Sequence, residues 1–191
     1  MELVLRGFGF RVLGTASDAE TGFRLITSLK PRVAIVDLNL PGENGAALTR
    51  RVLGREARLA VLLYSGVDED RLIEEALESG AGGFALKSSP PEELSKAVRV
   101  VSRGGFYLDP NLRSRVQSMP AAGERTGRLS PRERQVLSGL AEGLNGEGVA
   151  DRLSISAETV RTHVRNAMDK LEAHTRTHAV VLAVRRGEIE G

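Results

Sequence analysis

The chain changes its hydrophobic period once, and this change limits the folds that it can adopt. Up to about residue 102, short apolar runs alternate with segments of helical period, whereas from residue 130 onwards every segment has helical period. Alternating strands and helices favour a parallel sheet with right-handed crossovers, and a run of helices favours a bundle. The sequence therefore predicts an α/β domain followed by an all-α domain.

Four apolar runs in the first part have the length and composition of strands buried on both faces. Helical segments lie between these runs and after the last of them. In a parallel sheet of this kind, functional side chains gather where the strands end. We expect strands at 11–16, 32–37, 58–65 and 82–87, and helices at 18–30, 45–57, 68–80 and 90–104.

The second part begins with an irregular stretch. Asp109 followed by Pro110 is a start signal for a short helix, and residues 119–128 are small, polar and aperiodic, which is typical of a linker. We therefore divide the chain into an α/β domain (1–104), a linker with a short helix (105–128) and an all-α domain (129–191). The helices expected in the last domain are 131–143, 146–153, 157–171 and 175–186.

Composition excludes several classes of protein. The chain has no cysteine, which excludes disulfides and thiolate metal sites. No apolar run approaches the length of a membrane span, and the start lacks a basic-then-apolar export signal. We expect a cytoplasmic protein with no membrane partner. The formal net charge is only +2, so any case for nucleic-acid binding must rest on the local placement of charge.

Three polar residues end successive predicted strands: Asp37, Ser65 and Lys87. Parallel strands would bring them to one edge of the sheet. A carboxylate can serve there as nucleophile, while a lysine and a hydroxyl stabilise a phosphoryl group. A loop cap, a helix start and a solvated lysine would explain each residue alone. The three together favour a site of aspartyl phosphorylation.

The stretches DLNLPGENG, LLYSG and GGFALKSSPPEEL resemble the receiver domain of two-component response regulators, over residues 8–103. The resemblance implies a flavodoxin-like parallel sheet and a sensor histidine kinase that phosphorylates Asp37. It makes Ser65 the switch hydroxyl and Lys87 the lysine of the pocket. Phe84 takes the aromatic switch position, although a packed strand aromatic explains Phe84 as well.

The start of the chain departs from the receiver pattern. Receivers begin with a strand that ends in paired acids holding Mg²⁺, but MELVLRGFGF resembles the end of the first helix. We therefore expect a sheet that lacks its first strand, with open edges beside the gap. Mg²⁺ prefers octahedral oxygen coordination. With only Asp37 and the backbone of Asn39 as ligands, we expect no bound cofactor unless an acidic pair exists upstream.

Two explanations of this departure remain open. Either the natural start lies upstream of Met1, or the domain is a degenerate receiver that works without phosphate. The presence of Asp37, Ser65 and Lys87 favours the first explanation.

The all-α domain contains two short helices joined by a tight turn at 154–156, which is typical of a helix-turn-helix. Arginine can bind guanine edges and asparagine can bind adenine, while Thr159 and the helix start can bind phosphate. A small bundle with a solvated polar face explains the pattern equally well. The exposed face of helix 157–171 presents Arg161, Thr162, Arg165 and Asn166.

The stretches LSPRERQVL, AEGLN and VADRLSISAETVRTHVRNAMDKL resemble the LuxR/NarL-type DNA-binding domain over residues 129–187. The resemblance implies that helix 157–171 enters the major groove and that the protein binds DNA as a dimer. Glu147 and Gly148 depart from the family pattern. The resemblance assigns base-facing positions to Arg161, Thr162 and Arg165, phosphate contacts to Thr159, Asn166 and Arg176, and dimerisation to Ala179, Val180, Ala183 and Val184.

The sequence as a whole predicts a non-enzymatic transcriptional regulator. It would be the response regulator of a two-component phosphorelay, with Asp37 as phosphoacceptor, and its partners would be double-stranded DNA, a sensor histidine kinase and a second copy of itself. One alternative is a phosphate-independent regulator. Another is a protein-interaction module that does not bind DNA.

Overall fold

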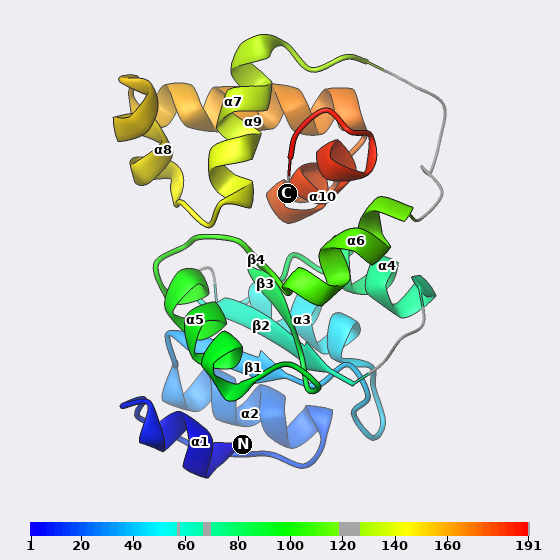
Figure 1. The fold of residues 1–191 in the computed structure, drawn as a ribbon. Helices are drawn as coiled ribbons and strands as arrows, with labels where there is room; N and C mark the ends of the chain where they lie inside the picture. Colours follow the sequence, from blue (N-terminus) through cyan, green and yellow to red (C-terminus); the bar gives the residue numbers. More distant parts are fainter. Residues whose placement is uncertain (57, 67–69, 119–126, 191) are drawn as a thin grey trace.

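The computed structural model describes residues 1–56, 58–66, 70–118 and 127–190. An α/β domain, which begins at the N-terminus, lies beneath a helical domain that ends at the C-terminus (Figure 1). The α/β domain contains one parallel sheet of four strands in the order β1-β2-β3-β4. The predicted fold class, a parallel sheet followed by a helical domain, is confirmed. The strands are β1 (Val33–Val36), β2 (Ala60–Ser65), β3 (Gly83–Leu86) and β4 (Tyr107–Leu108).

Two hydrophobic clusters cover opposite faces of this sheet. Alternate residues of a strand point to opposite faces, and accordingly Val61 and Leu63 join one cluster while Leu62 joins the other. The helices α2, α3 and α4 pack on the first face, and α1 and α5 on the second. Their bounds are α1 (Glu2–Gly7), α2 (Ala19–Leu29), α3 (Gly45–Leu53), α4 (Asp70–Glu78) and α5 (Pro91–Ser102).

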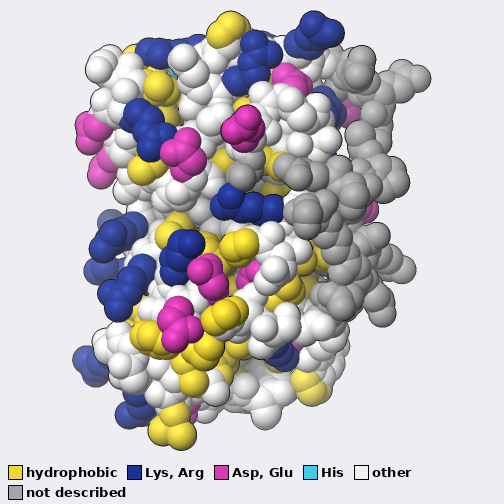
Figure 2. Space-filling view, in the orientation of Figure 1, with side chains coloured by type: hydrophobic (Ala, Val, Ile, Leu, Met, Phe, Trp, Pro, Cys, Tyr) yellow, Lys and Arg dark blue, Asp and Glu magenta, His cyan; other side chains and the backbone are white. Residues whose placement is uncertain are grey.

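The distribution of side chains on the surface differs between the two domains. In the space-filling view, apolar side chains gather over the α/β domain (Figure 2). All the large hydrophobic side chains that are exposed within the described ranges belong to the first 29 residues. The apolar surface therefore concentrates around the start of the chain.

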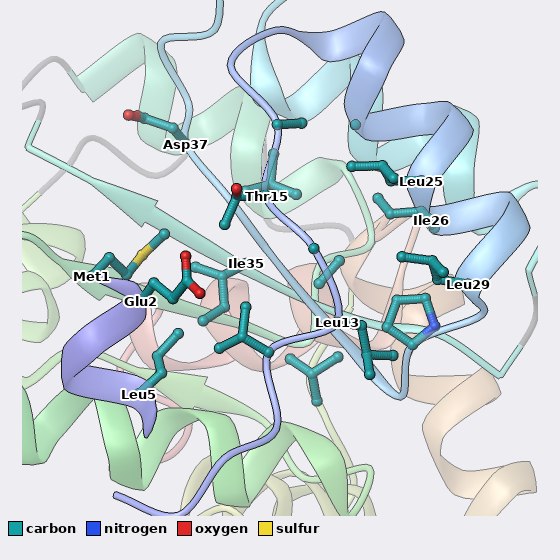
Figure 3. Close-up of a pocket in the computed structure, with 18 of the residues that line it drawn as sticks. Met1, Glu2, Leu5, Leu13, Thr15, Leu25, Ile26, Leu29, Ile35 and Asp37 are labelled. Carbon is teal, nitrogen blue, oxygen red and sulfur yellow. The ribbon is translucent and has the colours of Figure 1, made fainter. Parts of the chain in front are cut away.

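One predicted strand is wrong and one real strand was not predicted. Residues 11–16 form no strand, although Leu13 and Thr15 run beside β1 (Figure 3). A strand needs a neighbouring backbone to bond, and among the described residues no backbone hydrogen bond joins this segment to β1. The unpredicted strand, β4, spans only two residues, which is too short for a period to be recognised.

The helical domain agrees closely with the sequence prediction. Ser130 and Glu133 form a capping box at the start of α7, and Ser156 caps α9 by accepting from the Thr159 amide. The predicted linker boundary at 119–128 falls largely on residues 119–126, which lie outside the described ranges. The helices are α6 (Pro110–Ser118), α7 (Pro131–Ala141), α8 (Gly146–Leu153), α9 (Ala157–Leu171) and α10 (Arg176–Arg185). None of the described helices is long and apolar enough to cross a membrane.

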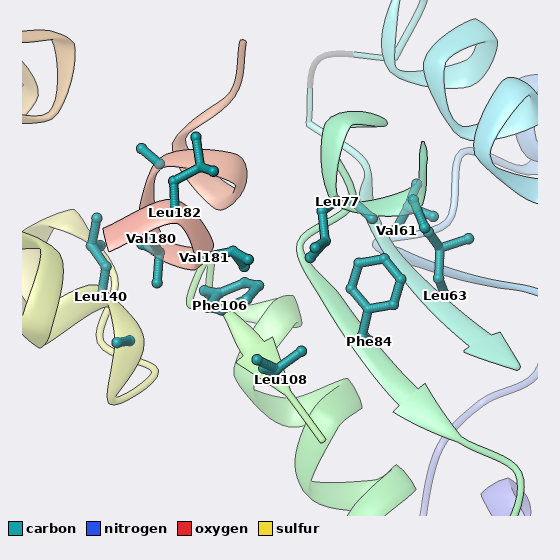
Figure 4. Packing of buried hydrophobic residues seen from close by; sticks show 14 of the residues in the cluster. Val61, Leu63, Leu77, Phe84, Phe106, Leu108, Leu140, Val180, Val181 and Leu182 are labelled. Carbon is teal, nitrogen blue, oxygen red and sulfur yellow. The ribbon is translucent and has the colours of Figure 1, made fainter. Parts of the chain in front are cut away.

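The two domains share a hydrophobic core at their junction. Phe106 at the end of the α/β domain lies against Val180 and Val181 of α10 (Figure 4). The Thr177 hydroxyl donates to the carbonyl oxygen of Ala81 at 2.9 Å. These contacts hold α10 against the sheet domain.

Charged and backbone contacts surround this core. Arg185 pairs with Glu74 of α4 at 3.3 Å, although the side chain of Arg185 is only 3% exposed. A Cβ atom placed on Gly105 would lie 2.2 Å from the carbonyl oxygen of Gly143. The junction therefore requires a glycine where the two backbones meet.

Candidate phosphoacceptor pocket and nucleic-acid interface

All three predicted pocket residues lie at the carboxyl edge of the sheet, and the side chains of two of them are in contact. Asp37 follows β1, and Lys87 follows β3. The Lys87 ammonium donates to Asp37 Oδ2, and the Asn39 amide donates to Asp37 Oδ1 at 3.1 Å. The side chains of Asp37 and Lys87 are 29% and 44% exposed. The carboxylate is therefore both neutralised by a cation and open to solvent on one side.

Ser65 lies at the end of β2, the strand between the other two. It is buried, and its carbonyl oxygen accepts from the Lys87 amide at 2.8 Å. Ser65 also pairs in register with Leu86, the residue before Lys87. The hydroxyl-bearing residue is thus placed on the same edge as the carboxylate and the ammonium.

A tight loop after Asp37 fixes the position of the carboxylate. The Gly45 amide donates to the Leu38 carbonyl at 2.9 Å. A Cβ atom on Gly45 would lie 2.1 Å from the Asp37 carbonyl oxygen. Asn44 then caps α3 by accepting from the Ala47 amide at 2.8 Å. The glycine in the ENG stretch is therefore required by a close approach of backbone to backbone.

Asp109 supports the pocket, and sequence reasoning missed this role. The buried carboxylate accepts from the Leu86 amide at 3.1 Å and from the Ser89 hydroxyl at 2.8 Å, on either side of Lys87. It also accepts from the Asn111 amide at 3.0 Å. Asp109 thus joins the lysine loop to the start of α6. The Asp-Pro pair indicated only a helix start, and no local signal shows the contact with a loop twenty residues earlier.

The pocket residues that the structure describes do not fit a Mg²⁺ ion. Among the described residues, no three His, Asp or Glu side chains form a group that could hold a metal. Asp37 lies at this edge, and Lys87 contacts its carboxylate. Because Mg²⁺ sites need several oxygen ligands in octahedral geometry, we derive no step through this metal.

Phe84 lies in the core rather than on the pocket surface. It is buried on β3, next to Leu77 and Leu63 (Figure 4). This position is that of a packed strand aromatic. The predicted switch role of Phe84 stays a prediction.

The second candidate site is the exposed face of α9. Val160, Ala167 and Leu171 are buried and fix the opposite face of this helix against the domain core. The Ser156 hydroxyl accepts from the Thr159 amide at 3.0 Å, which defines the start of the helix. The exposed face carries the four polar residues that the sequence placed there: Arg161, Thr162, Arg165 and Asn166.

An acid on the same helix engages the first of these arginines. Glu158 accepts from Arg161, and this hydrogen bond lowers the pKa of the Glu158 carboxyl. Both side chains are largely exposed. The guanidinium of Arg161 is therefore paired with a carboxylate of its own helix in this structure.

The predicted dimerisation residues are buried in this conformation, whereas Arg176 is exposed but bonded across the domain junction. Arg176 donates to the Gly104 carbonyl at 2.9 Å, across the domain junction. The helix that carries it, α10, contacts α4 and α6. Buried positions on α10 include all four predicted dimerisation residues: Ala179, Val180, Ala183 and Val184.

A buried ion pair anchors α9 to α7. Lys170 donates to Glu133 at 2.8 Å, and the side chain of Glu133 is 5% exposed. Burial alone would raise the pKa of the Glu133 carboxyl, but hydrogen bonds from Lys170 and the Ser130 amide outweigh burial and lower it. The position of α9 therefore depends on a charged Glu133.

Comparison with known proteins gives a consistent picture of both domains. A family model described as response regulator receiver domain matches residues 1–99, and one described as bacterial regulatory proteins, luxR family, matches residues 127–183. The probable transcriptional regulatory protein NarL of Mycobacterium tuberculosis is 35% identical over 181 residues, covering 92% of this chain and 82% of that protein.

Two further relatives extend the comparison. The nitrate/nitrite response regulator protein NarL of Escherichia coli K12 is 33% identical over 175 residues, covering 89% of this chain and 81% of that protein. A structure of the RcsB response regulator of Salmonella typhimurium, solved to describe conformational dynamism for DNA interaction, is 26% identical with a TM-score of 0.56. It covers 90% of this chain and 85% of that one.

Proposed function

The chain belongs to the response regulators that join a receiver domain to a luxR-family domain, and on this premise we propose how it works. It regulates transcription by binding double-stranded DNA as a homodimer, with α9 in the major groove. The receiver domain controls when this happens. The protein acts in the cytoplasm and is not an enzyme, since its chemistry is limited to its own phosphorylation.

The exposed polar face of α9 is the observation that carries DNA binding. Arg161, Thr162 and Arg165 lie in the first half of the helix, whose start is capped and whose other face is buried. A helix held in this way projects its side chains from a rigid base. Arginine paired with guanine contributes about 1–3 kcal/mol of discrimination. The DNA interaction described for RcsB, a related response regulator, supports the proposal.

The domain junction supports control by the receiver. We call the arrangement in this structure, with the two domains packed together, the closed form. In the closed form the predicted dimerisation positions of α10 are buried, while the polar face of α9 is exposed. Opening the junction would release α10 for contact with a second copy. This is a two-state rearrangement of packed domains, and dimerisation on DNA would then favour the open form.

Asp37 is the proposed input. A phosphoryl group passes from a phosphohistidine of a sensor kinase to the Asp37 carboxylate: the N–P bond breaks, an O–P bond forms, and the departing imidazole takes a proton. Lys87, which contacts the free carboxylate, would move to the phosphoryl oxygens, and Ser65 would hydrogen-bond one of them. This step needs metal ligands beyond those at the pocket.

The pocket geometry also favours a second candidate for the input. Asp37 is already paired with Lys87, and the residues that the structure describes around it form no group of three acidic or histidine side chains that could hold Mg²⁺. A regulator controlled by a partner protein at the receiver domain would need neither phosphate nor metal. The DNA-binding output is the same in both cases. A protein-interaction module without DNA binding has no specific observation in its favour.

Selection from a randomised duplex pool, followed by titration of the selected duplex, tests the output. We expect the logarithm of the binding constant to fall linearly with the logarithm of the salt concentration, as phosphate contacts require. Arg165→Ala should cost about 1–3 kcal/mol on the selected duplex. The matched control is Arg24→Ala, which removes the same charge from the exposed face of α2. If Arg165→Ala and Arg24→Ala bind alike, α9 is not the element that reads DNA.

A further inference from the structure

A cavity of about 330 Å³ lies where α5 meets the helical domain. Its lining comes from three places: Phe8 just after α1, the exposed face of α5, and Gly143 in the turn between α7 and α8. None of its lining residues belongs to the phosphoacceptor pocket or to α9. We call this cavity the junction groove.

Close contacts hold the two domains together around the junction groove. The side-chain amide of Asn145 donates to the Arg103 carbonyl at 2.9 Å. Gly143 approaches α5 so closely that a Cβ atom on it would lie 3.3 Å from Val100 Cγ1. Because both domains contribute to its lining, a ligand in the groove would contact both of them at once.

The charge of the junction groove is positive. Lys96, Arg99 and Arg103 line it, whereas Glu92 is the one acid among its described lining residues. Lys96 lies 3.6 Å from Glu93 of the same helix. Lys and Arg side chains gather over α5, on the left of the view in Figure 2. The helix rises only about 10 Å between the first and last of these cations, which suits a small anion better than the length of a duplex.

One of these arginines is fixed in position by its neighbours. The guanidinium of Arg99 donates to the Phe8 carbonyl at 3.2 Å and lies 5.1 Å from the centre of the Phe10 ring. Neither Arg99 nor Arg103 pairs with an acid in the part of the chain that the structure describes. Because the planar guanidinium matches the geometry of phosphate oxygens, both arginines retain donors for a bound anion.

A buried hydroxyl gives independent evidence for a ligand. Ser95 lines the junction groove, although it is only 6% exposed. A serine inside a helix commonly bonds to a carbonyl of the preceding turn, as Ser102 does to the Arg99 carbonyl at 2.8 Å. The Ser95 hydroxyl has no hydrogen-bond partner among the described residues. Because buried polar groups are rarely left unpaired, this hydroxyl indicates a partner from outside the chain.

We propose that the junction groove binds a small organic phosphate, whose phosphoryl oxygens accept from Arg99, Arg103 and the Ser95 hydroxyl. Charge-assisted hydrogen bonds of this kind are stronger than neutral ones. Phe8 and Val100 offer apolar contacts to the organic part of the ligand. The volume of the groove is that of a small-molecule site. Since the ligand would contact both domains, its binding would stabilise the closed form.

Titration of the full chain with pyrophosphate and, separately, with ATP tests the proposal. Metal-free buffer with about 0.15 M salt screens general surface charge, and the amide NMR signals of Ser95 and Gly143 report from each domain. We expect both probes to shift both signals to saturation, with ATP binding more tightly. Arg103→Ala should weaken binding about tenfold and Ser95→Ala about threefold, as loss of one hydrogen bond to a charged group predicts. The matched control is Arg24→Ala, which removes an exposed arginine from α2 and should leave the affinity unchanged.

Each other result decides against the proposal. If Arg103→Ala and Arg24→Ala bind the probes alike, the effect is one of general surface charge and the groove is not a site. Pyrophosphate binding as tightly as ATP would refute contacts with an organic part, and a shift at Ser95 without one at Gly143 would refute a ligand that bridges the domains. If duplex DNA shifts these signals and neither probe does, the groove contacts DNA instead. The titrations do not depend on DNA binding, so their outcome is independent of the proposed output.

Discussion

The helical domain and the sheet domain differ in the contacts that form them. The helices begin at local caps, whereas the sheet needs strands distant in the sequence and has an open edge. Each of the helices α7, α8 and α9 begins with a side-chain cap from the residue just before it: Ser130, Asn145 and Ser156. The sheet depends on partners far apart in the sequence, and β1 has a partner on one side only within the described ranges. Local signals therefore specify these helices of the output domain, while the receiver domain has an open sheet edge beside the residue proposed to receive the signal.

Gly45→Ala should break the sheet domain and leave the helical domain intact. The added Cβ would lie 2.1 Å from the Asp37 carbonyl oxygen, so the loop or α3 must move. We expect a loss of about 1–3 kcal/mol, measured as faster amide exchange throughout the α/β domain. Gly7→Ala is the matched control, because its Cβ would meet nothing within 4 Å. Equal loss of amide protection in both domains would show that the helical domain does not unfold independently of the sheet domain.

Glu133→Ala tests the helical domain in the same way. It removes the capping box of α7 and the partner of Lys170, and we expect the helical domain to lose about 1–3 kcal/mol. Denaturant unfolding at neutral pH measures the effect.

The pH dependence of this pair has a definite sign. The folded protein lowers the pKa of Glu133, so its contribution is complete above the unfolded value and is lost as pH falls through the folded value. The stability difference between the natural chain and Glu133→Gln should therefore shrink as pH falls below about 4.3, the usual pKa of glutamate. A difference that is constant from neutral to acidic pH would contradict the charged pair.

These contrasts match what could be predicted from the sequence. The helices α8 and α9 were predicted with their bounds, because caps and apolar faces are local signals. The prediction of a strand at 11–16 was wrong because the described sheet offers no neighbouring strand to which this segment hydrogen-bonds. Asp109 and the Gly105–Gly143 contact were missed because each joins residues distant along the chain. The Asp37–Lys87 contact was foreseen only because strand ends share an edge.

The smallest expected effect is at Asp37. With acetyl phosphate and Mg²⁺, we expect no stoichiometric phosphorylation of this chain, because no three His, Asp or Glu side chains among the described residues form a group that could hold the metal. Intact-protein mass spectrometry measures the label, and Asp37→Asn is the control. Stoichiometric labelling that Asp37→Asn abolishes would show that the sheet domain is chemically complete despite its open edge.

The most direct test of the account is the effect of Gly105→Ala on dimerisation and DNA binding. The added Cβ would lie 2.2 Å from the Gly143 carbonyl oxygen, whereas a Cβ on Gly146 would meet nothing within 4 Å, so Gly146→Ala is the control. Sedimentation with a selected duplex should show Gly105→Ala dimerising and binding DNA more tightly than the natural chain and the control. If Gly105→Ala binds as the natural chain does, the closed junction does not restrain the output domain, and the proposed control by the receiver is wrong.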